Sequence, residues 1–117
     1  MDREACIRAG IDYDEGVARF VGRADMYEKF LAQFPEDPGF SALDEAMGSG
    51  DVSAAFQAAH SLKGVSGNLS VNNLYHSLIP FVNALRGAGD LPLAKTLYPP
   101  VEEAYRTAIQ CIREQRG

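Results

Sequence analysis

The chain has 117 residues, 46% of them hydrophobic, and a formal net charge of −5 at pH 7. This length suits one compact domain with a hydrophobic core and is too short for two. The acidic balance argues against nucleic acid and anionic membranes as partners, because both bind basic surfaces. We therefore predict a single domain over residues 1–117, with proteins as its partners.

The ends of the chain and its cysteines carry no sign of export or metal binding. No apolar run is long enough to span a bilayer, and the start, M-D-R-E-A-C, lacks the hydrophobic region of a signal peptide. A cytoplasmic protein is therefore expected. Cys6 and Cys111 have no zinc-site spacing, so ordinary thiols are expected, and a disulfide between the chain ends is the less favoured alternative.

Short helices are predicted in the first half of the chain. Asp12 and Glu15 have the spacing of a capping box, so a short helix is expected to start there and to stop at Gly22. Apolar residues at intervals of three and four predict an amphipathic helix over residues 24–34. The same spacing predicts another helix over residues 37–50, which ends in glycines.

Longer helices are predicted in the second half. Asp51 is well placed to cap a helix from 52 to about 68, whose mostly apolar arc of small residues suits a bundle interior. Ser70 is expected to cap the next helix, which ends at a pair of glycines. Pro80 inside that helix is expected to produce a kink near residues 76–80.

The last part of the chain has helical spacing on both sides of a double proline. Because Pro99 and Pro100 interrupt the pattern, two helical pieces are expected there. No stretch alternates long enough to form a strand, and short loops favour antiparallel neighbours. The predicted fold is all-α: an antiparallel up-down four-helix bundle with an extra short N-terminal helix.

The stretch A-H-S-L-K-G-V-S-G-N-L, residues 59–69, departs from ordinary bundle composition. It contains His60, Lys63, Gly64 and Gly67. At about 100° per residue, these four fall within roughly 100° of one another on a helix. Helical side chains lean toward the N-terminus, so Gly64 leaves space over His60, and Gly67, the next position along the same strip, is expected to leave it clear as well. Each glycine inside a helix costs about 1 kcal/mol relative to alanine, so we infer that a bulky group approaches the histidine.

The chemistry available at this face is phosphoryl transfer. A neutral imidazole can accept a phosphoryl group on nitrogen without a nearby base, and Lys63 supplies a flexible cation for the phosphoryl oxygens. The chain has no Walker-type or dinucleotide-binding loop and no evident carboxylate cluster for magnesium. We therefore predict a phosphoryl carrier rather than an enzyme, with no cofactor or metal site of its own.

The motif H-S-L-K-G at residues 60–64, followed by small residues and N-L, resembles the H-x-L-K-G motif of the histidine phosphotransfer (HPt) family of two-component phosphorelays. Residues 10–31 resemble the family's usual approach to its second bundle helix. Residues 48–60 resemble its usual lead-in to the histidine. The resemblance covers residues 10 to about 86.

This resemblance implies a four-helix bundle in which His60 becomes a phosphohistidine, supported by Lys63 and given clearance by Gly64. The phosphoryl group would come from a receiver-domain aspartate or a kinase and pass to another receiver aspartate. The implied partners are receiver domains of response regulators, which supply the aspartate and magnesium, and a hybrid sensor histidine kinase. A monomer is expected.

Some positions depart from the family's pattern, namely Ser70, Pro80 and Val82. Val82 stands where a polar residue often faces the histidine. The orientation of the His60 imidazole is then set by Asn83 or by water, or it is not fixed at all. Arg86, one turn beyond Val82, adds positive charge near the site only if the kink leaves it on that face.

Val82 and Pro80 motivate a rival interpretation, a docking module that binds a kinase or receiver without accepting phosphate. The discriminating feature is whether His60 is exposed with Lys63 beside it. His76 lacks any Lys or Gly pattern, so it is interpreted as a helix-surface residue or a partner of a freed carbonyl, not as a ligand.

Overall fold

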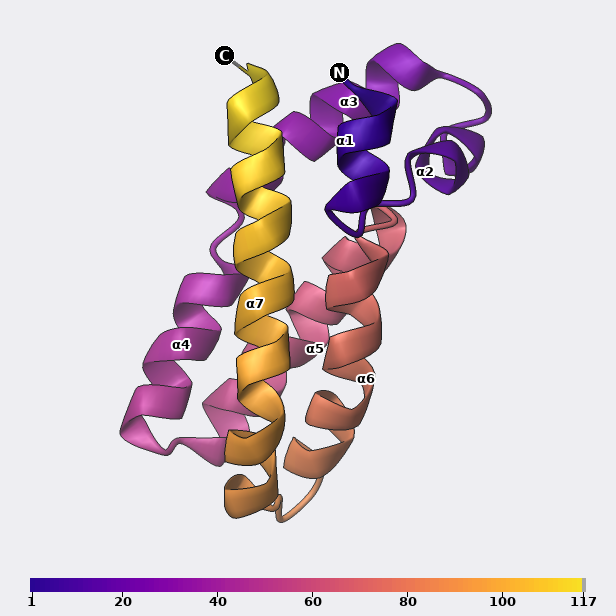
Figure 1. Ribbon diagram of the computed structural model, residues 1–117. Helices are drawn as coiled ribbons and strands as arrows, with labels where there is room; N and C mark the ends of the chain where they lie inside the picture. Colours follow the sequence, from indigo (N-terminus) through magenta and orange to yellow (C-terminus); the bar gives the residue numbers. More distant parts are fainter. Residues whose placement is uncertain (117) are drawn as a thin grey trace.

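The computed structural model describes residues 1–116, and every regular element in them is helical (Figure 1). The all-helical prediction is therefore confirmed. The elements are α1 (Arg3–Arg8), α2 (Tyr13–Arg19), α3 (Ala24–Gln33), the 3-10 turn η1 (Phe34–Glu36), α4 (Gly39–Ser49), α5 (Val52–Asn68), α6 (Asn72–Leu85) and α7 (Leu91–Arg116). None of the described helices is long and apolar enough to cross a membrane.

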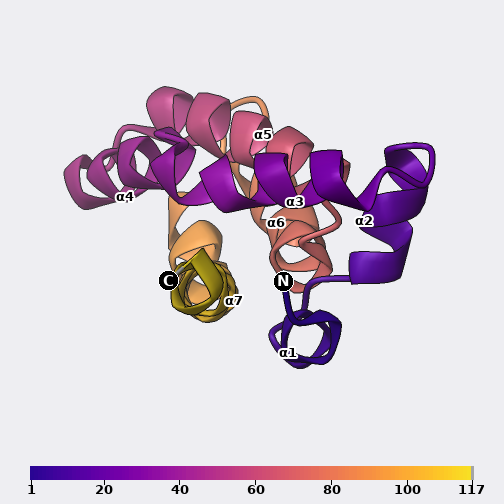
Figure 2. The same cartoon turned by 90° about the horizontal axis from the view of Figure 1, so that it is seen from above.

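The last four helices of the chain, α4 to α7, pack each against the next (Figure 1). Each of them runs in the opposite direction to the helix before it. The largest interfaces join α4 to α5, α5 to α6, and α6 to α7. The N-terminal helices α1, α2 and α3 gather at the end where α5 finishes and α6 begins, with α3 lying across that end (Figure 2). The N-terminal segment therefore meets the bundle beside the last turns of α5.

Two predicted caps are present and one is not. The carboxylates of Asp12 and Asp51 each accept a hydrogen bond from the backbone N–H of the third residue of the helix that follows, as expected for N-caps. Ser70 is not a cap, so that prediction is wrong: it has a φ of 54°, and Val71 precedes α6 without a side-chain cap. The Ser70 hydroxyl bonds to α2 instead.

The prediction that the last helix has two pieces is also wrong, because α7 runs unbroken through Pro99 and Pro100. Both prolines are exposed, whereas Tyr98 and Val101 beside them are buried against the rest of the bundle. A proline removes one backbone hydrogen bond from a helix, and its ring clashes with the preceding turn. In α7 the burial of the apolar face offsets this loss of stability. At Pro80 the sequence predicted one helix with a kink and not a break, and α6 does run through this proline.

The helix α1 was missed by the sequence analysis and has little periodic signal. It is six residues long and buries only Cys6, and its cap is Asp2, whose carboxylate accepts from the Ala5 N–H. Cys6 and Cys111 are both buried free thiols, as expected. The amide of Gln115 in α7 donates to the Cys6 sulfur at 3.8 Å, which ties α7 to α1, and it also lies 2.9 Å from the sulfur of Cys111 in α7 itself.

The packing of α2 and α3 against the bundle depends on Tyr27, whose side chain is fully buried. Its hydroxyl donates to the backbone carbonyl of Leu69 at 2.7 Å, just after α5. A Cβ on Gly16 of α2 would lie 2.1 Å from the Tyr27 ring, so only glycine lets α2 lie this close. This contact fixes α2 beside the C-terminal half of α5.

Candidate functional site

Helix α5 presents the residues of the predicted site at its solvent side. Ala55, Ala59 and Ser66 are fully buried, which matches the arc of small residues expected to face the interior. His60 and Gly64 are exposed, and Lys63 is half-buried. The histidine therefore lies where a second protein can reach it.

A hollow of about 400 Å³ opens beside His60, between α2, α5 and the start of α6. It brings His60, Lys63, Gly64 and Gly67 together at one place, as the helical spacing predicted. The remaining lining residues are mainly polar or charged and come from α2, the end of α5 and α6: Glu15, Arg19, Asn68, Asn72, Tyr75 and His76.

The two glycines of the site have different surroundings. A Cβ added at Gly64 would meet no atom within 4 Å, so the space beside it is open. A Cβ added at Gly67 would lie 2.9 Å from the Tyr75 ring, so the room there is already filled. Gly67 accommodates the Tyr75 ring rather than an incoming group, and the expected clearance next to His60 rests on Gly64.

This difference predicts opposite effects on stability. We expect Gly64→Ala to raise the free energy of unfolding by about 1 kcal/mol, because alanine is the better helix former and its Cβ meets nothing. Gly67→Ala should not raise the free energy of unfolding, because the Tyr75 ring must move to admit the new Cβ. Urea denaturation of the two variants measures the contrast. Equal stabilisation by both would contradict the close contact at Tyr75.

The imidazole of His60 stacks on Phe56 one turn earlier in α5, with ring centroids 5.8 Å apart. Among residues 1–116, no group forms a hydrogen bond with this imidazole, so neither Asn83 nor any other side chain fixes its tautomer. Val82 is fully buried in the core, and its side chain has no hydrogen-bonding group to offer the imidazole. Arg86 lies with its guanidinium carbon 5.4 Å from the centre of the Phe56 ring, outside the lining of the hollow.

The structure adds two charged residues and a second histidine that the sequence analysis did not place here. Glu15 had been assigned to a capping box and His76 to the helix surface or to a freed carbonyl, whereas Arg19, one turn beyond Glu15 on α2, had no assigned role. Their common location depends on how α2 folds back onto the α5–α6 turn. The i,i+4 spacing of Glu15 and Arg19 places them on one face of α2, but the sequence does not indicate which helices that face contacts.

Ser70 makes this connection between α2 and the turn. Its hydroxyl donates to Glu15 Oε1 at 2.8 Å and accepts from Arg19 Nε at 3.2 Å. The amide of Asn72 also approaches Glu15 Oε1, at 3.4 Å. The Ser70 hydrogen bond is the main reason that the pKa of Glu15 is lowered from its usual value. Glu15 is therefore a charged carboxylate, surrounded by donors.

Comparison with protein families gives a match that covers most of the chain. The family described as the Hpt domain matches residues 25–114. No curated protein and no solved structure matches the chain. The matched region begins later than the resemblance to residues 10–86 and extends well into α7. It includes His60 and Lys63 but leaves out α1 and α2.

Proposed function

The chain belongs to the Hpt domain family, and from this premise we propose that His60 accepts a phosphoryl group from a receiver-domain aspartate, or from a kinase, and passes it to another receiver aspartate. The family has a phosphotransfer role in two-component phosphorelays, and its members are phosphoryl carriers rather than catalytic domains. We further propose that residues 1–117 act as one domain, with α4 to α7 as its up-down four-helix bundle.

The observation that carries this proposal is the exposure of His60 at a hollow that also contains Lys63 and the open side of Gly64. A ring nitrogen of His60 attacks phosphorus in line with the aspartyl oxygen of the donor, and the bond to that oxygen breaks as the bond to nitrogen forms. Lys63 neutralises charge on the phosphoryl oxygens. The docked receiver supplies the aspartate and the magnesium ion.

An apolar hollow next to the site supports a protein as the partner. It encloses about 970 Å³ and shares Asn68 with the His60 hollow. Its apolar lining comes from α3, η1, α5 and the residues that follow α2 and α5, and polar side chains such as Lys29 and Asp37 also line it. Phe30 in this lining is 44% exposed. Apolar surface of this kind, rimmed by polar residues, is typical of protein docking sites, so a receiver seated over His60 would cover it.

The rival function is docking without phosphoryl transfer. It is favoured by the absence, among residues 1–116, of a hydrogen-bond partner for the His60 imidazole, which follows from the buried Val82. The exposure of His60 beside Lys63 favours transfer instead, because an aspartyl phosphate can reach the ring. The two functions give different outcomes in one assay.

The test is phosphoryl transfer from a phosphorylated receiver or hybrid kinase to the wild type, to His60→Gln and to His76→Gln. The last variant is the matched control, because His76 lines the same hollow. We expect an acid-labile, alkali-stable label on the wild type and on His76→Gln, and none on His60→Gln. A folded wild type that accepts no label from any donor would favour the docking module.

A further inference from the structure

The helix α2 lies outside the matched family region, yet it forms one wall of the His60 hollow. We propose that Arg19 of α2 is a second cation of the site and binds the phosphoryl group on His60 together with Lys63. This inference rests on the proposed function. It assigns a phosphoryl-binding residue to a segment that a family match over residues 25–114 does not include.

Arg19 is held at one end and available at the other. Its Nε donates to Ser70 Oγ at 3.2 Å and lies 3.5 Å from Glu15 Oε1, while its side chain remains 50% exposed. Among residues 1–116, nothing accepts a hydrogen bond from its two terminal nitrogens. A guanidinium offers its N–H groups in a planar fork that matches phosphate oxygens, so these nitrogens can bind an oxyanion without breaking the contact to Ser70.

Ser70 holds this arrangement in a backbone conformation that serine rarely adopts. Its φ is 54°, in the left-handed region, and its side chain is fully buried. Such a conformation is strained for a residue with a side chain and persists where the surroundings determine it. Here the backbone N–H groups of Ser70 and Val71 bond to carbonyls in the last turn of α5, as in a left-handed helix cap, and the Ser70 hydroxyl adds its bonds to Glu15 and Arg19. Ser70 and Glu15 are thus positioning residues for Arg19.

The charges in the hollow explain why Lys63 alone is insufficient. Glu15 carries a negative charge in the same lining as Lys63, so these two charges cancel. Histidines apart, the net positive charge of the lining therefore comes from Arg19. A protein-bound phosphoryl group carries a charge of about −1.5 to −2 at pH 7. Without Arg19, that group would enter a hollow with no net positive charge.

The experiment uses phosphoramidate, a small phosphoryl donor without a protein surface, so that docking to a partner does not enter the measured rate. We expect Arg19→Gln to slow phosphorylation of His60 by about 3- to 10-fold, because a charge-assisted hydrogen bond at a half-exposed site is lost. The ³¹P resonance of the phosphohistidine should also shift. Arg23→Gln is the matched control, because Arg23 is an exposed arginine paired with Asp25 and does not line the hollow.

Two further variants separate phosphoryl binding from a structural role. Arg19→Lys, which keeps the charge but not the fork, should fall between the wild type and Arg19→Gln. Ser70→Ala, which releases Arg19 Nε, should slow the reaction by about 2- to 3-fold. Thermal unfolding by circular dichroism checks that each variant is folded. If Arg19→Gln does not fold, Arg19→Lys carries the comparison.

The outcomes distinguish the inference from the function beneath it. If the wild type is labelled on His60 but Arg19→Gln matches Arg23→Gln in rate and ³¹P resonance, the inference is wrong and the proposed function stands. The inference is equally overturned if Arg19→Gln slows transfer only from a receiver, because Arg19 then contacts the partner. If the folded wild type takes no label from phosphoramidate or from any receiver, both the inference and the proposed function are wrong.

Discussion

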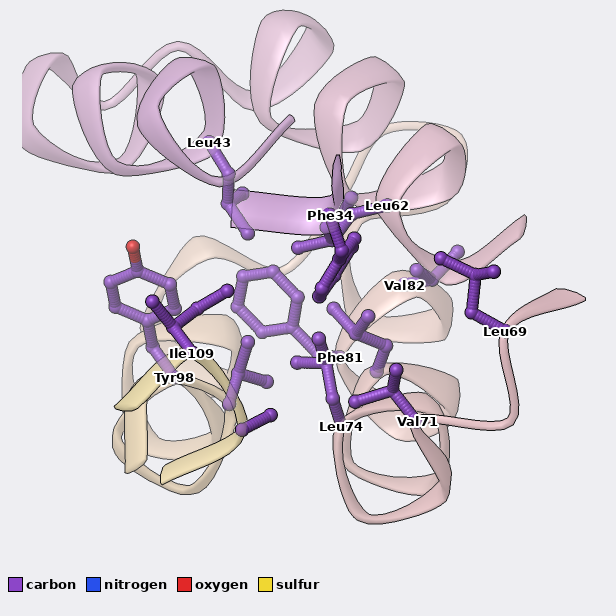
Figure 3. Packing of buried hydrophobic residues seen from close by; sticks show 14 of the residues in the cluster. Phe34, Leu43, Leu62, Leu69, Val71, Leu74, Phe81, Val82, Tyr98 and Ile109 are labelled. Atoms are coloured by element: carbon purple, nitrogen blue, oxygen red, sulfur yellow. The ribbon is translucent and has the colours of Figure 1, made fainter. Parts of the chain in front are cut away.

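Replacing Phe81 by alanine is expected to lower the free energy of unfolding by about 3–5 kcal/mol. Phe81 is fully buried in α6, and its ring stacks against that of Tyr98 in α7, with centroids 5.4 Å apart. Figure 3 shows it at the centre of the core, surrounded by side chains from neighbouring helices. Because α4, α6 and α7 all contribute side chains around this ring, they are not expected to close the cavity that alanine leaves.

Urea denaturation measures this loss, and the same substitution at Phe30 is its control. Phe30 is 44% exposed and its ring lies 5.7 Å from that of Phe20. Phe30→Ala should therefore cost only about 1 kcal/mol. A loss at Phe81 as small as that at Phe30 would mean that the α6–α7 interface repacks, contrary to the close-packed core.

The fold was predictable from the sequence where helical period and caps agree. Asp51 and the small residues after it identified α5 almost to the residue, because both its start and its buried arc follow local rules. The break predicted at Pro99 and Pro100 in α7 was wrong. Proline shows where a helix is weakened, but the sequence does not show how strongly burial of the apolar face stabilises the same helix. Helix α1 was missed because six residues give too little periodicity.

The candidate site was predictable as far as it lies on one helix. His60, Lys63 and Gly64 share a face of α5 by spacing alone, and the structure brings them to one hollow. The residues that α2 contributes were not predictable, because they are held at the hollow by hydrogen bonds to the Ser70 hydroxyl, which join residues more than 50 positions apart in the sequence. Gly67 was misinterpreted for a related reason, since only the fold shows that the Tyr75 ring fills its space.

The open side of Gly64 leads to the sharpest functional prediction. We expect Gly64→Gln to slow transfer from a phosphorylated receiver to His60 by about 100-fold or more, because a displacement of the reacting groups by about 1 Å can cost that much. A glutamine side chain at 64 leans back along α5 over His60. The protein should remain folded, because a Cβ at this position meets no atom within 4 Å.

Gly48→Gln is the matched control for this substitution. Gly48 lies in α4, does not line the hollow, and also has open space where a Cβ would be. This variant should transfer at the wild-type rate. Phosphoramidate should be slowed less than a receiver by Gly64→Gln, because the small donor brings no protein surface to the histidine. Equal receiver rates for the two variants would show that clearance at Gly64 does not limit access, and the glycine would then need another explanation.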